Sequence, residues 1–307
     1  MNKNYDLIII GGGPAGVTAG IYSARQRLNA LLITKNFGGQ IARKAVPIEN
    51  YPGLGEISSV DLIQKFERDL KKHPIEIKNV SVFKIKKEKD GFIVVTEKKE
   101  KIKTKTIIIT TGADPRPLEI PGEKEFIGKG VSYCVACDGP IFAKKDLVVA
   151  GGGNSAFEAA LSLSNYANKI YIIERGDKIR ADEKNQEKVK GNNKIEVITN
   201  ATLKEIKGDK FVKEIIYQEK KTKKNISLSV SGLFVEIGSQ PATAFIKGLV
   251  EFNDKDEIVV DSTNCRTKTE GIWAAGDVNN IPFKQIVIAA GAGAMAAMDV
   301  SIYLQRK

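Results

Sequence analysis

The chain has 307 residues and is 42% hydrophobic and 28% charged, a composition typical of a soluble globular protein long enough for two ordinary domains. Its three cysteines exclude a disulfide scaffold. We predict no membrane span, taking every apolar run to be shorter than the roughly 18–20 residues that a membrane helix needs. Residues 6–10 run into Gly11 without a cleavage-site pattern, so we expect a buried strand rather than a signal peptide, and a cytoplasmic location.

The net charge of +11 predicts a lysine-rich surface. Such a surface is either simply solvated or steers the protein toward an acidic protein partner. Nucleic acid is a poorer candidate, because acidic residues interrupt several of the lysine-rich stretches at 84–89, 97–105 and 220–224, and we find no aromatic interleaving or reader motif.

Residues 5–110 predict a β-α-β unit followed by a helix and antiparallel strands. Short apolar runs that end in glycine indicate parallel strands, and the alternation around Asp90-Gly91 indicates a hairpin. The expected elements are a strand at 5–10, a helix at 17–26, a strand at 30–33, an amphipathic helix at 61–72, alternating strands at 76–106 and a buried strand at 107–110.

A second β-α-β unit is predicted after a crossing marked by prolines 115, 117 and 121. Apolar periodicity again separates buried strands from helices. The expected elements are a strand at 146–150, a helix at 155–165, strands at 169–173, 195–199, 211–218, 226–230 and 232–237, an apolar segment at 273–275, and a long helix rich in small residues at 285–304.

Gly11-Gly12-Gly13-Pro14-Ala15-Gly16 lies between the first strand and the first helix. In such a turn the first glycine permits the tight bend, the second lets the backbone approach a pyrophosphate, and the third lets helix and strand pack closely. The helix N-terminus adds amide groups and partial positive charge. The acidic ribose ligand expected about 20 residues later is missing. The strand there ends at Thr34-Lys35-Asn36, and Gly38-Gly39-Gln40 follows as a second backbone-rich loop.

Gly151-Gly152-Gly153-Asn154-Ser155-Ala156 is a second turn of this kind, in the permitted alanine variant. Glu174 follows the next strand at the distance expected for a ribose ligand. It can accept hydrogen bonds from both ribose hydroxyls of NADH, and it would repel a 2′-phosphate. Arg175 and Arg180 lie just beyond, where they either pair with such a phosphate or are solvated.

Between the two turns lies the dithiol motif Cys134-Val135-Ala136-Cys137-Asp138. Zinc needs about four ligands, and the chain offers only His73 and Cys265 besides this pair, so we favour redox chemistry and no metal. Asp138 either exchanges a proton with the thiols or simply forms a turn. We expect His73 to be a surface residue at a helix end and Cys265 a half-buried strand cysteine. Two nucleotide-binding turns and a dithiol predict electron transfer through a flavin and a nicotinamide.

The chain resembles the low-molecular-weight thioredoxin reductase family over nearly its whole length. The residues that carry the resemblance are Gly11–Gly16, Gly38-Gly39-Gln40, Glu49–Gly53, Thr111-Gly112, Cys134–Gly139, Gly151–Ser155, Gly232–Gly238, Gly271–Val278 and Lys284-Gln285-Ile286. The resemblance implies an α/β fold with two Rossmann-like dinucleotide-binding domains of the three-layer ββα type. FAD would bind residues 1–114 and 241–307, and NAD(P)H the domain at 115–240 that is inserted between them.

By the same resemblance we assign candidate ligands to each cofactor. The FAD ligands are Gly11, Gly13, Pro14, Ala15, Gly16, Thr34, Lys35, Gly38, Gly39, Gln40, Asn50, Val82, Thr111, Gly112, Gly276, Asp277, Lys284, Gln285 and Ile286. The NAD(P)H ligands are Gly151, Gly153, Asn154, Ser155, Glu158, Glu174, Arg175, Arg180, Ile237 and Gly238.

The family also implies roles for the catalytic residues Cys134, Cys137 and Asp138. Cys137 would lie nearer the flavin and Cys134 would attack the disulfide of a thioredoxin-like partner, with Asp138 handling a proton. The family implies a homodimer, and a rotation of the inserted domain that alternates flavin contact between the dithiol and the nicotinamide.

The coenzyme stretch departs from the family pattern, which reads His-Arg-Arg, three residues, then Arg. Here Glu174 replaces the histidine and Gly176 the middle arginine, so we expect NADH to serve at least as well as NADPH. The chain also resembles the flavoprotein of the NADH-dependent alkyl hydroperoxide reductase system at Glu174, Cys134–Pro140 and Lys284–Ile288. We do not find that protein's extra N-terminal dithiol domain, so such a role would need a separate carrier. A relative reduced by ferredoxin and a non-catalytic, FAD-binding redox sensor are further alternatives.

Overall fold

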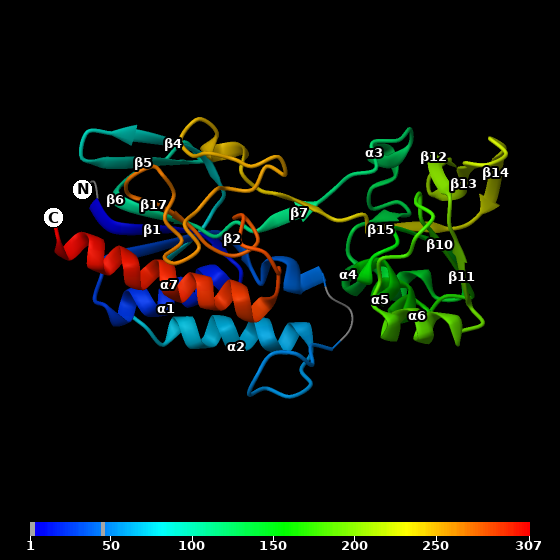
Figure 1. Cartoon of the computed structure of the whole chain (residues 1–307), viewed down its shortest axis with the longest axis horizontal. Helices are drawn as coiled ribbons and strands as arrows, with labels where there is room; N and C mark the ends of the chain where they lie inside the picture. The colour runs from blue at the N-terminus through cyan, green and yellow to red at the C-terminus, as the bar shows by residue number, and fades with distance from the viewer. Residues whose placement is uncertain (1–3, 44–46) are drawn as a thin grey trace. The chain divides into compact units, whose positions relative to one another are not determined.

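A computed structural model describes residues 4–43 and 47–307, with the backbone but not the side chains of Arg43, Ala136 and Cys137. The described chain forms two compact units (Figure 1). One, the first unit, contains residues 4–42, Pro47–Asp114 and Gln240–Lys307, and the other, the inserted unit, contains Pro115–Ser239. Strands β7 (Ala113–Pro115) and β16 (Ser239–Pro241), which connect the units, pair as a two-stranded sheet.

The first unit is built on a seven-stranded sheet with the order β3-β2-β1-β6-β5-β4, in which β17 also pairs with β6. Strands β1, β2, β3, β6 and β17 run parallel to one another, whereas β5 pairs antiparallel with both β6 and β4. The bounds are β1 Asn4–Gly12, β2 Ala30–Phe37, β3 Glu76–Asn79, β4 Val82–Glu88, β5 Gly91–Thr96, β6 Lys101–Ile109 and β17 Ile272–Ala274.

The parallel strands of the first unit are buried on both faces, which explains their unbroken apolar runs. In β1, Leu7 and Ile9 face a core made with helices, and Ile8 and Ile10 face a core made with the β4–β5 hairpin. The helices are α1 (Pro14–Arg25), α2 (Ser59–Lys71) and α7 (Ile286–Gln305), with short 3-10 turns η1 (Gly39–Arg43) and η3 (Ala244–Ile246).

Helix α7 corrects one sequence expectation. It is long and apolar enough, by length and composition, to cross a membrane, contrary to the prediction that no such run exists. It packs along α1 (Figure 1), and a Cβ at Gly293 would lie 2.1 Å from the Ala15 carbonyl oxygen, so only glycine permits this approach. A core helix passes the same length and composition test, and the residues of α7 that face α1 and the sheet, such as Ala292 and Ala296, are buried.

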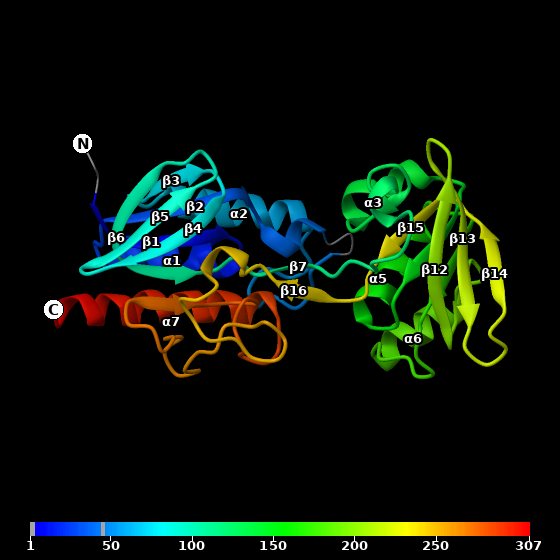
Figure 2. The same ribbon diagram turned by 90° about the horizontal axis from the view of Figure 1, so that it is seen from above.

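The inserted unit has three layers. A five-stranded parallel sheet, β11-β10-β9-β15-β8, packs against helices on one face and an antiparallel meander, β12-β13-β14, on the other. Figure 2 shows the meander as a layer of its own. The strands are β8 Val131–Ser132, β9 Asp146–Ala150, β10 Lys169–Ile173, β11 Ile195–Ile198, β12 Ala201–Gly208, β13 Val212–Glu219, β14 Asn225–Ser229 and β15 Gly232–Val235, and the helices are α3 Glu123–Phe126, α4 Val135–Asp138, η2 Gly139–Phe142, α5 Asn154–Leu163 and α6 Glu183–Lys190.

Strand β9 divides these layers by the alternation of its side chains. Leu147 and Val149 belong to the core shared with the helices, whereas Val148 and Ala150 belong to the core shared with the meander. In the first unit, too, helices pack on one face of the parallel strands and the antiparallel strands β4 and β5 on the other, although here they continue the same sheet. The predicted α/β class with two ββα units is therefore confirmed.

Candidate functional site

The first glycine turn forms a cradle between β1 and α1. A Cβ at Gly11, whose φ is +120°, would lie 2.3 Å from the Thr110 carbonyl oxygen, and one at Gly16 would lie 1.9 Å from that of Gly11. A Cβ at Gly13 would meet no described atom within 4 Å, so this glycine keeps the outer side of the turn open. Gly13 is also the N-cap of α1, and no described side chain caps that end. The turn therefore fits a pyrophosphate at a helix N-terminus.

Two further pairs of predicted FAD ligands meet in the first unit. Gln40, in η1, donates a hydrogen bond from Nε2 to Asp277 Oδ2 at 3.0 Å. Asn50 Nδ2 donates to Gln285 Oε1 at 3.2 Å. Gln285 is the N-cap of α7, Ile286 is its first residue, and no described side chain caps it. The amides at this end of α7 are therefore placed to face an electron-rich group, as expected for the flavin edge.

The remaining predicted FAD ligands have more varied surroundings. Thr34 Oγ1 donates to the Asn36 carbonyl at 2.7 Å and lies directly under Gly12. Thr111 Oγ1 donates to the Ala242 carbonyl at 2.8 Å. Lys35 is exposed, and Val82 is half-buried at the start of β4. A positive φ, which favours glycine, is found at Gly38, Gly39, Gly112 and Gly276.

Asp277 is a half-buried acidic group in the first unit's site. Burial raises its pKa, and the positive charge of Lys284 partly opposes that rise. Lys284 itself is bound elsewhere: its Nζ lies 3.0 Å from Glu257 Oε1 and donates to the Asn279 carbonyl. The structure thus uses Lys284 to hold the loop around Asp277.

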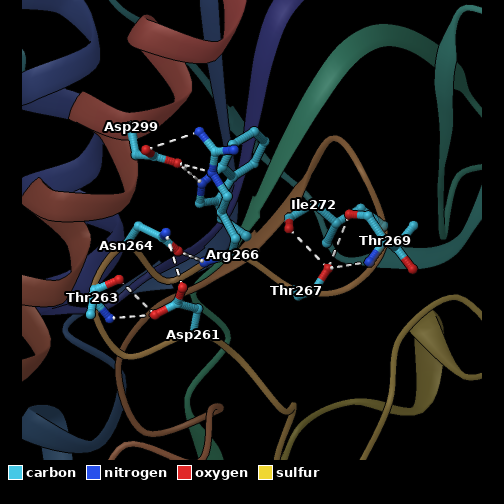
Figure 3. A network of polar contacts seen from close by, with 9 residues as sticks. Asp261, Thr263, Asn264, Arg266, Thr267, Thr269, Ile272 and Asp299 are labelled. Atoms are coloured by element: carbon cyan, nitrogen blue, oxygen red, sulfur yellow. Dashed lines mark hydrogen bonds and ion pairs between the residues drawn. The ribbon is translucent and has the colours of Figure 1, made fainter.

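The segment that leads to Asp277 is fixed by a polar network (Figure 3). Asp299 of α7 accepts hydrogen bonds from Arg266 Nη2 at 3.0 Å and from the Trp273 indole at 2.8 Å. Thr267 Oγ1 donates to the Ile272 carbonyl at 2.9 Å, at the start of β17. These contacts tie β17, and hence the Gly276-Asp277 turn that follows it, to α7.

The second glycine turn repeats the geometry of the first in the inserted unit. A Cβ at Gly151, with φ +129°, would lie 2.3 Å from the Glu236 carbonyl oxygen, whereas one at Gly153 would meet no described atom within 4 Å. Gly153 is the N-cap of α5, and Ser155 and Glu158 lie on that helix. Gly238, with φ +105°, and the partly exposed Ile237 follow β15. This turn therefore fits a second pyrophosphate.

Glu174 lies beneath the second glycine turn and is only 3% exposed. Its Oε1 accepts from the Gly176 amide at 2.7 Å, and its Oε2 lies 3.4 Å from Arg180 Nη2. The Arg180 and Ala181 amides both donate to the Gly152 carbonyl, so the loop after Glu174 folds back onto the turn. The carboxylate is held in place and retains acceptor sites for ribose hydroxyls, because it has about four lone-pair sites in all.

Asn154 is hydrogen-bonded within the inserted unit, whereas the side chain of Arg175 is exposed. Asn154 Nδ2 donates to Asp182 Oδ2 at 2.7 Å, and its Oδ1 accepts from the Asp182 amide at 2.7 Å, so it joins α5 to the start of α6. Arg175 is exposed to solvent. Of the two arginines that could pair with a 2′-phosphate, Arg180 is already paired with Glu174.

The dithiol motif lies at the end of β8. Cys134 is disulfide-bonded. The side chain of Cys137, in α4, lies outside the described residues. The Asp138 amide donates to the Cys134 carbonyl at 3.1 Å, and the Asp138 carboxylate accepts a hydrogen bond from Ser132 Oγ at 2.6 Å. Asp138 is thus held against the residue that carries the disulfide.

Sequence reasoning missed Ser132, Glu123 and Tyr133. Glu123 is 1% exposed, and its carboxylate accepts from the Leu118 and Glu119 amides at 2.7 Å each and from the Tyr133 hydroxyl at 2.5 Å. Burial and this bond to Glu123 raise the pKa of Tyr133. Glu123 stands in a charged stretch with no periodicity, so no sequence signal marked it as buried. The cluster ties the segment before Cys134 to the start of the inserted unit.

Cys265 and His73 are the two further residues that were weighed as metal ligands. The prediction that Cys265 is a half-buried strand cysteine is wrong, because the residue lies in a loop and is wholly buried. Burial raises the pKa of its thiol to about 12. His73 is partly exposed just after α2, as expected. Among the described residues no group of His, Cys, Asp and Glu could hold a metal ion.

The chain is similar to known redox proteins in sequence. The family described as pyridine nucleotide-disulphide oxidoreductase matches residues 5–296. An NADH dehydrogenase of Bacillus subtilis is 38% identical over 302 residues, 98% of this chain and 59% of that protein. An alkyl hydroperoxide reductase protein of Staphylococcus aureus is 37% identical over 303 residues, with the same 98% and 59% coverage. The chain therefore spans about three-fifths of the length of these curated relatives.

The fold is similar to solved structures over their full length. Lactococcus lactis thioredoxin reductase, in its FR conformation, has a TM-score of 0.94 and 38% identity, covering 99% of this chain and 100% of that one. Thioredoxin reductase of T. acidophilum has a TM-score of 0.91 and 35% identity, covering 98% and 99%. The resemblance drawn from the sequence motifs is confirmed.

Proposed function

The chain belongs to the pyridine nucleotide-disulphide oxidoreductase family, and from that premise we propose that it is a thioredoxin reductase. It transfers electrons from NAD(P)H through FAD and the Cys134/Cys137 dithiol to the disulfide of a thioredoxin-like protein. The single observation that carries the proposal is the Asp138 carboxylate held next to the disulfide-bonded Cys134. A carboxyl group beside a disulfide can supply the proton that a departing thiolate takes up during thiol–disulfide exchange.

The cofactors are assigned to the two glycine turns. FAD, when bound, supplies a two-electron carrier between the nicotinamide and the disulfide. Gly11–Gly16, Gln40, Asp277 and the start of α7 hold it in the first unit. Gly151–Gly153 and Glu174 hold the nicotinamide nucleotide in the inserted unit.

The dithiol and Asp138 carry out the exchange with the partner. The Cys134 thiolate attacks one sulfur of the partner's disulfide, and the departing partner thiolate takes a proton from Asp138. The Cys137 thiolate then attacks the Cys134 sulfur, which restores the Cys134–Cys137 disulfide and releases the second partner thiolate. Two electrons and the atoms balance in these steps.

The coenzyme proposal favours NADH at least as much as NADPH. A 2′-phosphate beside the buried Glu174 carboxylate would bring two negative charges together, and the pairing of Arg180 with Glu174 limits what that arginine offers to a phosphate.

The net charge and the exposed apolar residues support proposals about the protein partner and the oligomeric state. The net charge of +11 favours an acidic thioredoxin-like protein and makes its encounter rate sensitive to salt. Helix α7 exposes Val287, Met298 and Ile302, which supports a homodimer that covers this apolar face. We place the protein in the cytoplasm, with no nucleic acid and no membrane as partners.

A second candidate is the flavoprotein of a peroxiredoxin-reducing system. Glu174 and the similarity to the alkyl hydroperoxide reductase protein of Staphylococcus aureus favour it. The chain corresponds to 59% of the length of that protein. In this role a dithiol carrier would link Cys134 to the peroxidase.

The test is an anaerobic titration of flavin reduction with NADH and NADPH, followed by a coupled assay with thioredoxin as acceptor. Cys134→Ser and Cys137→Ser should abolish disulfide reduction and leave flavin reduction largely intact, because the half-reactions use different groups. A wild-type protein whose flavin bleaches with coenzyme but which reduces no disulfide would instead support a redox sensor. A colourless protein that cannot be reconstituted with FAD contradicts the whole proposal.

A further inference from the structure

Ser132 lies between the two chemical groups of the dithiol site. Its Oγ donates to Asp138 Oδ2 at 2.6 Å and accepts from the Cys134 amide at 3.0 Å. The side chain is 4% exposed and its residue pairs with Phe234 in the parallel sheet. The oxygen is therefore anchored to the parallel sheet of the inserted unit.

The position of the hydroxyl proton follows from the distances. Ser132 Oγ has one proton and two nearby acceptors, Asp138 Oδ2 at 2.6 Å and the Cys134 carbonyl oxygen at 3.3 Å. The shorter contact is within the range of about 2.5–2.7 Å for a hydroxyl bound to a carboxylate, the stronger class of hydrogen bond. The proton therefore points to Asp138, and two hydrogen bonds run in series from the Cys134 amide to the Asp138 carboxylate.

The hydrogen bond from Ser132 distinguishes the two carboxylate oxygens of Asp138. Oδ2 is committed to Ser132, and no described residue is hydrogen-bonded to Oδ1. The Asp138 amide is fixed on the Cys134 carbonyl as well, so backbone and side chain together leave the carboxylate little freedom to rotate. Oδ1 is then the oxygen that can exchange a proton with sulfur.

We propose that Ser132 is a positioning residue for the dithiol reaction, which orients the Asp138 carboxylate so that Oδ1 delivers a proton to the leaving thiolate. This rests on the proposed function, in which Asp138 is the proton carrier. A purely structural role would be a local turn, in which the serine oxygen serves only the amide two residues on. The two roles differ in whether Ser132 acts through Asp138.

The test compares the variants Ser132→Val and Ser132→Thr. The two new side chains have the same shape, but threonine keeps the hydroxyl group and valine has a methyl group in its place. A positioned acid–base group is worth roughly 10²–10⁴-fold, and we expect loss of its orientation to remove about tenfold of kcat for thioredoxin reduction in Ser132→Val. Ser132→Thr should stay within about threefold of wild type, and KM for thioredoxin and flavin reduction by coenzyme should be unchanged in both. Equal losses in the two variants would assign Ser132 a structural role and overturn the proposal.

A double-mutant cycle with Asp138→Asn asks whether Ser132 acts through Asp138. In the Asp138→Asn background, Ser132→Val should slow the reaction by less than about twofold, because there is no carboxylate left to orient. A full tenfold loss in that background contradicts the proposal, and so does a wild-type rate for Ser132→Val alone.

A second readout needs neither coenzyme nor thioredoxin. Dithiothreitol reduces the Cys134 disulfide in the purified protein, and quenching with an alkylating reagent followed by mass measurement gives the rate. Ser132→Val should slow this reduction and Ser132→Thr should not. If wild type fails to reduce thioredoxin, the proposed function fails, while the dithiothreitol rates still decide whether Ser132 orients Asp138.

Discussion

Gln40 and Asp277 are 237 positions apart in sequence, yet Gln40 Nε2 donates a hydrogen bond to Asp277 Oδ2 at 3.0 Å. Gln40 follows two glycines of positive φ, and Asp277 follows Gly276, whose φ is +83°. Both side chains therefore depend on backbone conformations that favour glycine. Their meeting joins the loop after β2 to the turn after β17 in one proposed FAD site.

Gln40→Ala should weaken FAD binding about tenfold, because a hydrogen bond to a charged group is worth about 1.5–3 kcal/mol and its loss frees the Asp277 side chain. The measurement is the Kd for FAD in apoprotein reconstitution, followed by flavin fluorescence. Gln186→Ala is the matched control, since Gln186 donates to the Ala181 carbonyl in the inserted unit. Equal FAD affinity in Gln40→Ala and wild type would mean that this pair does not support the cofactor.

The coenzyme preference should depend on Glu174. We expect wild type to use NADH at least as well as NADPH, and Glu174→His to move the ratio of kcat/KM toward NADPH by about tenfold, or about 1.4 kcal/mol. The measurement is kcat/KM for disulfide reduction with each coenzyme. Glu183→Gln, which removes an exposed carboxylate at the start of α6, should leave the ratio unchanged. A wild-type preference for NADPH above about tenfold would show that the arginines dominate.

The cysteines should differ sharply in reactivity. The thiolate is the reactive species, and burial raises the pKa of Cys265 to about 12, so almost none of this thiol is ionised at pH 8. After reduction of the native protein, iodoacetamide should label Cys134 within minutes and leave Cys265 unlabelled until the protein is denatured. Peptide mass mapping before and after denaturation gives the answer, and rapid native labelling of Cys265 would refute the prediction.

Glu257 should stabilise the fold in a pH-dependent manner. Burial pushes its pKa upward, but hydrogen bonds from Asn253 and Lys284 and the charge of Lys284 outweigh burial, so its folded-state pKa lies below the usual 4.5. A lowered pKa means that the stabilisation is present above pH 4.5 and is lost as the pH falls through the folded-state value. Glu257→Gln should therefore cost on the order of 1 kcal/mol of unfolding free energy at pH 7 and progressively less toward pH 3.

Urea unfolding of both proteins across this pH range measures the difference. Asp277 has a raised pKa and thus the opposite sign, favouring the folded state at low pH, but it is common to both proteins and cancels in the comparison. A cost that stays constant from pH 7 to pH 3 would mean that Glu257 acts by packing rather than by charge.

The sequence by itself determined the parts of this protein that depend on local backbone sterics. Gly11 and Gly151 have φ of +120° and +129°, and any Cβ there would collide with a neighbouring carbonyl, so the chemistry of each turn is readable from its residues. The apolar runs of β1 and β9 follow from burial on both faces, which needs no knowledge of the partner elements. Helix α6 was missed because its residues are largely polar and carry no apolar periodicity.

Only the tertiary structure decided which distant side chains meet. Long-range contacts depend on the register of sheets and the packing of helices, and residue type alone does not encode them. Gln40 meets Asp277 across 237 positions of sequence, and Glu174 lies beneath Gly152 because the loop after β10 folds back onto the turn. Likewise α7 has the composition of a membrane span, and it is the close approach to α1 at Gly293 that makes it a core helix.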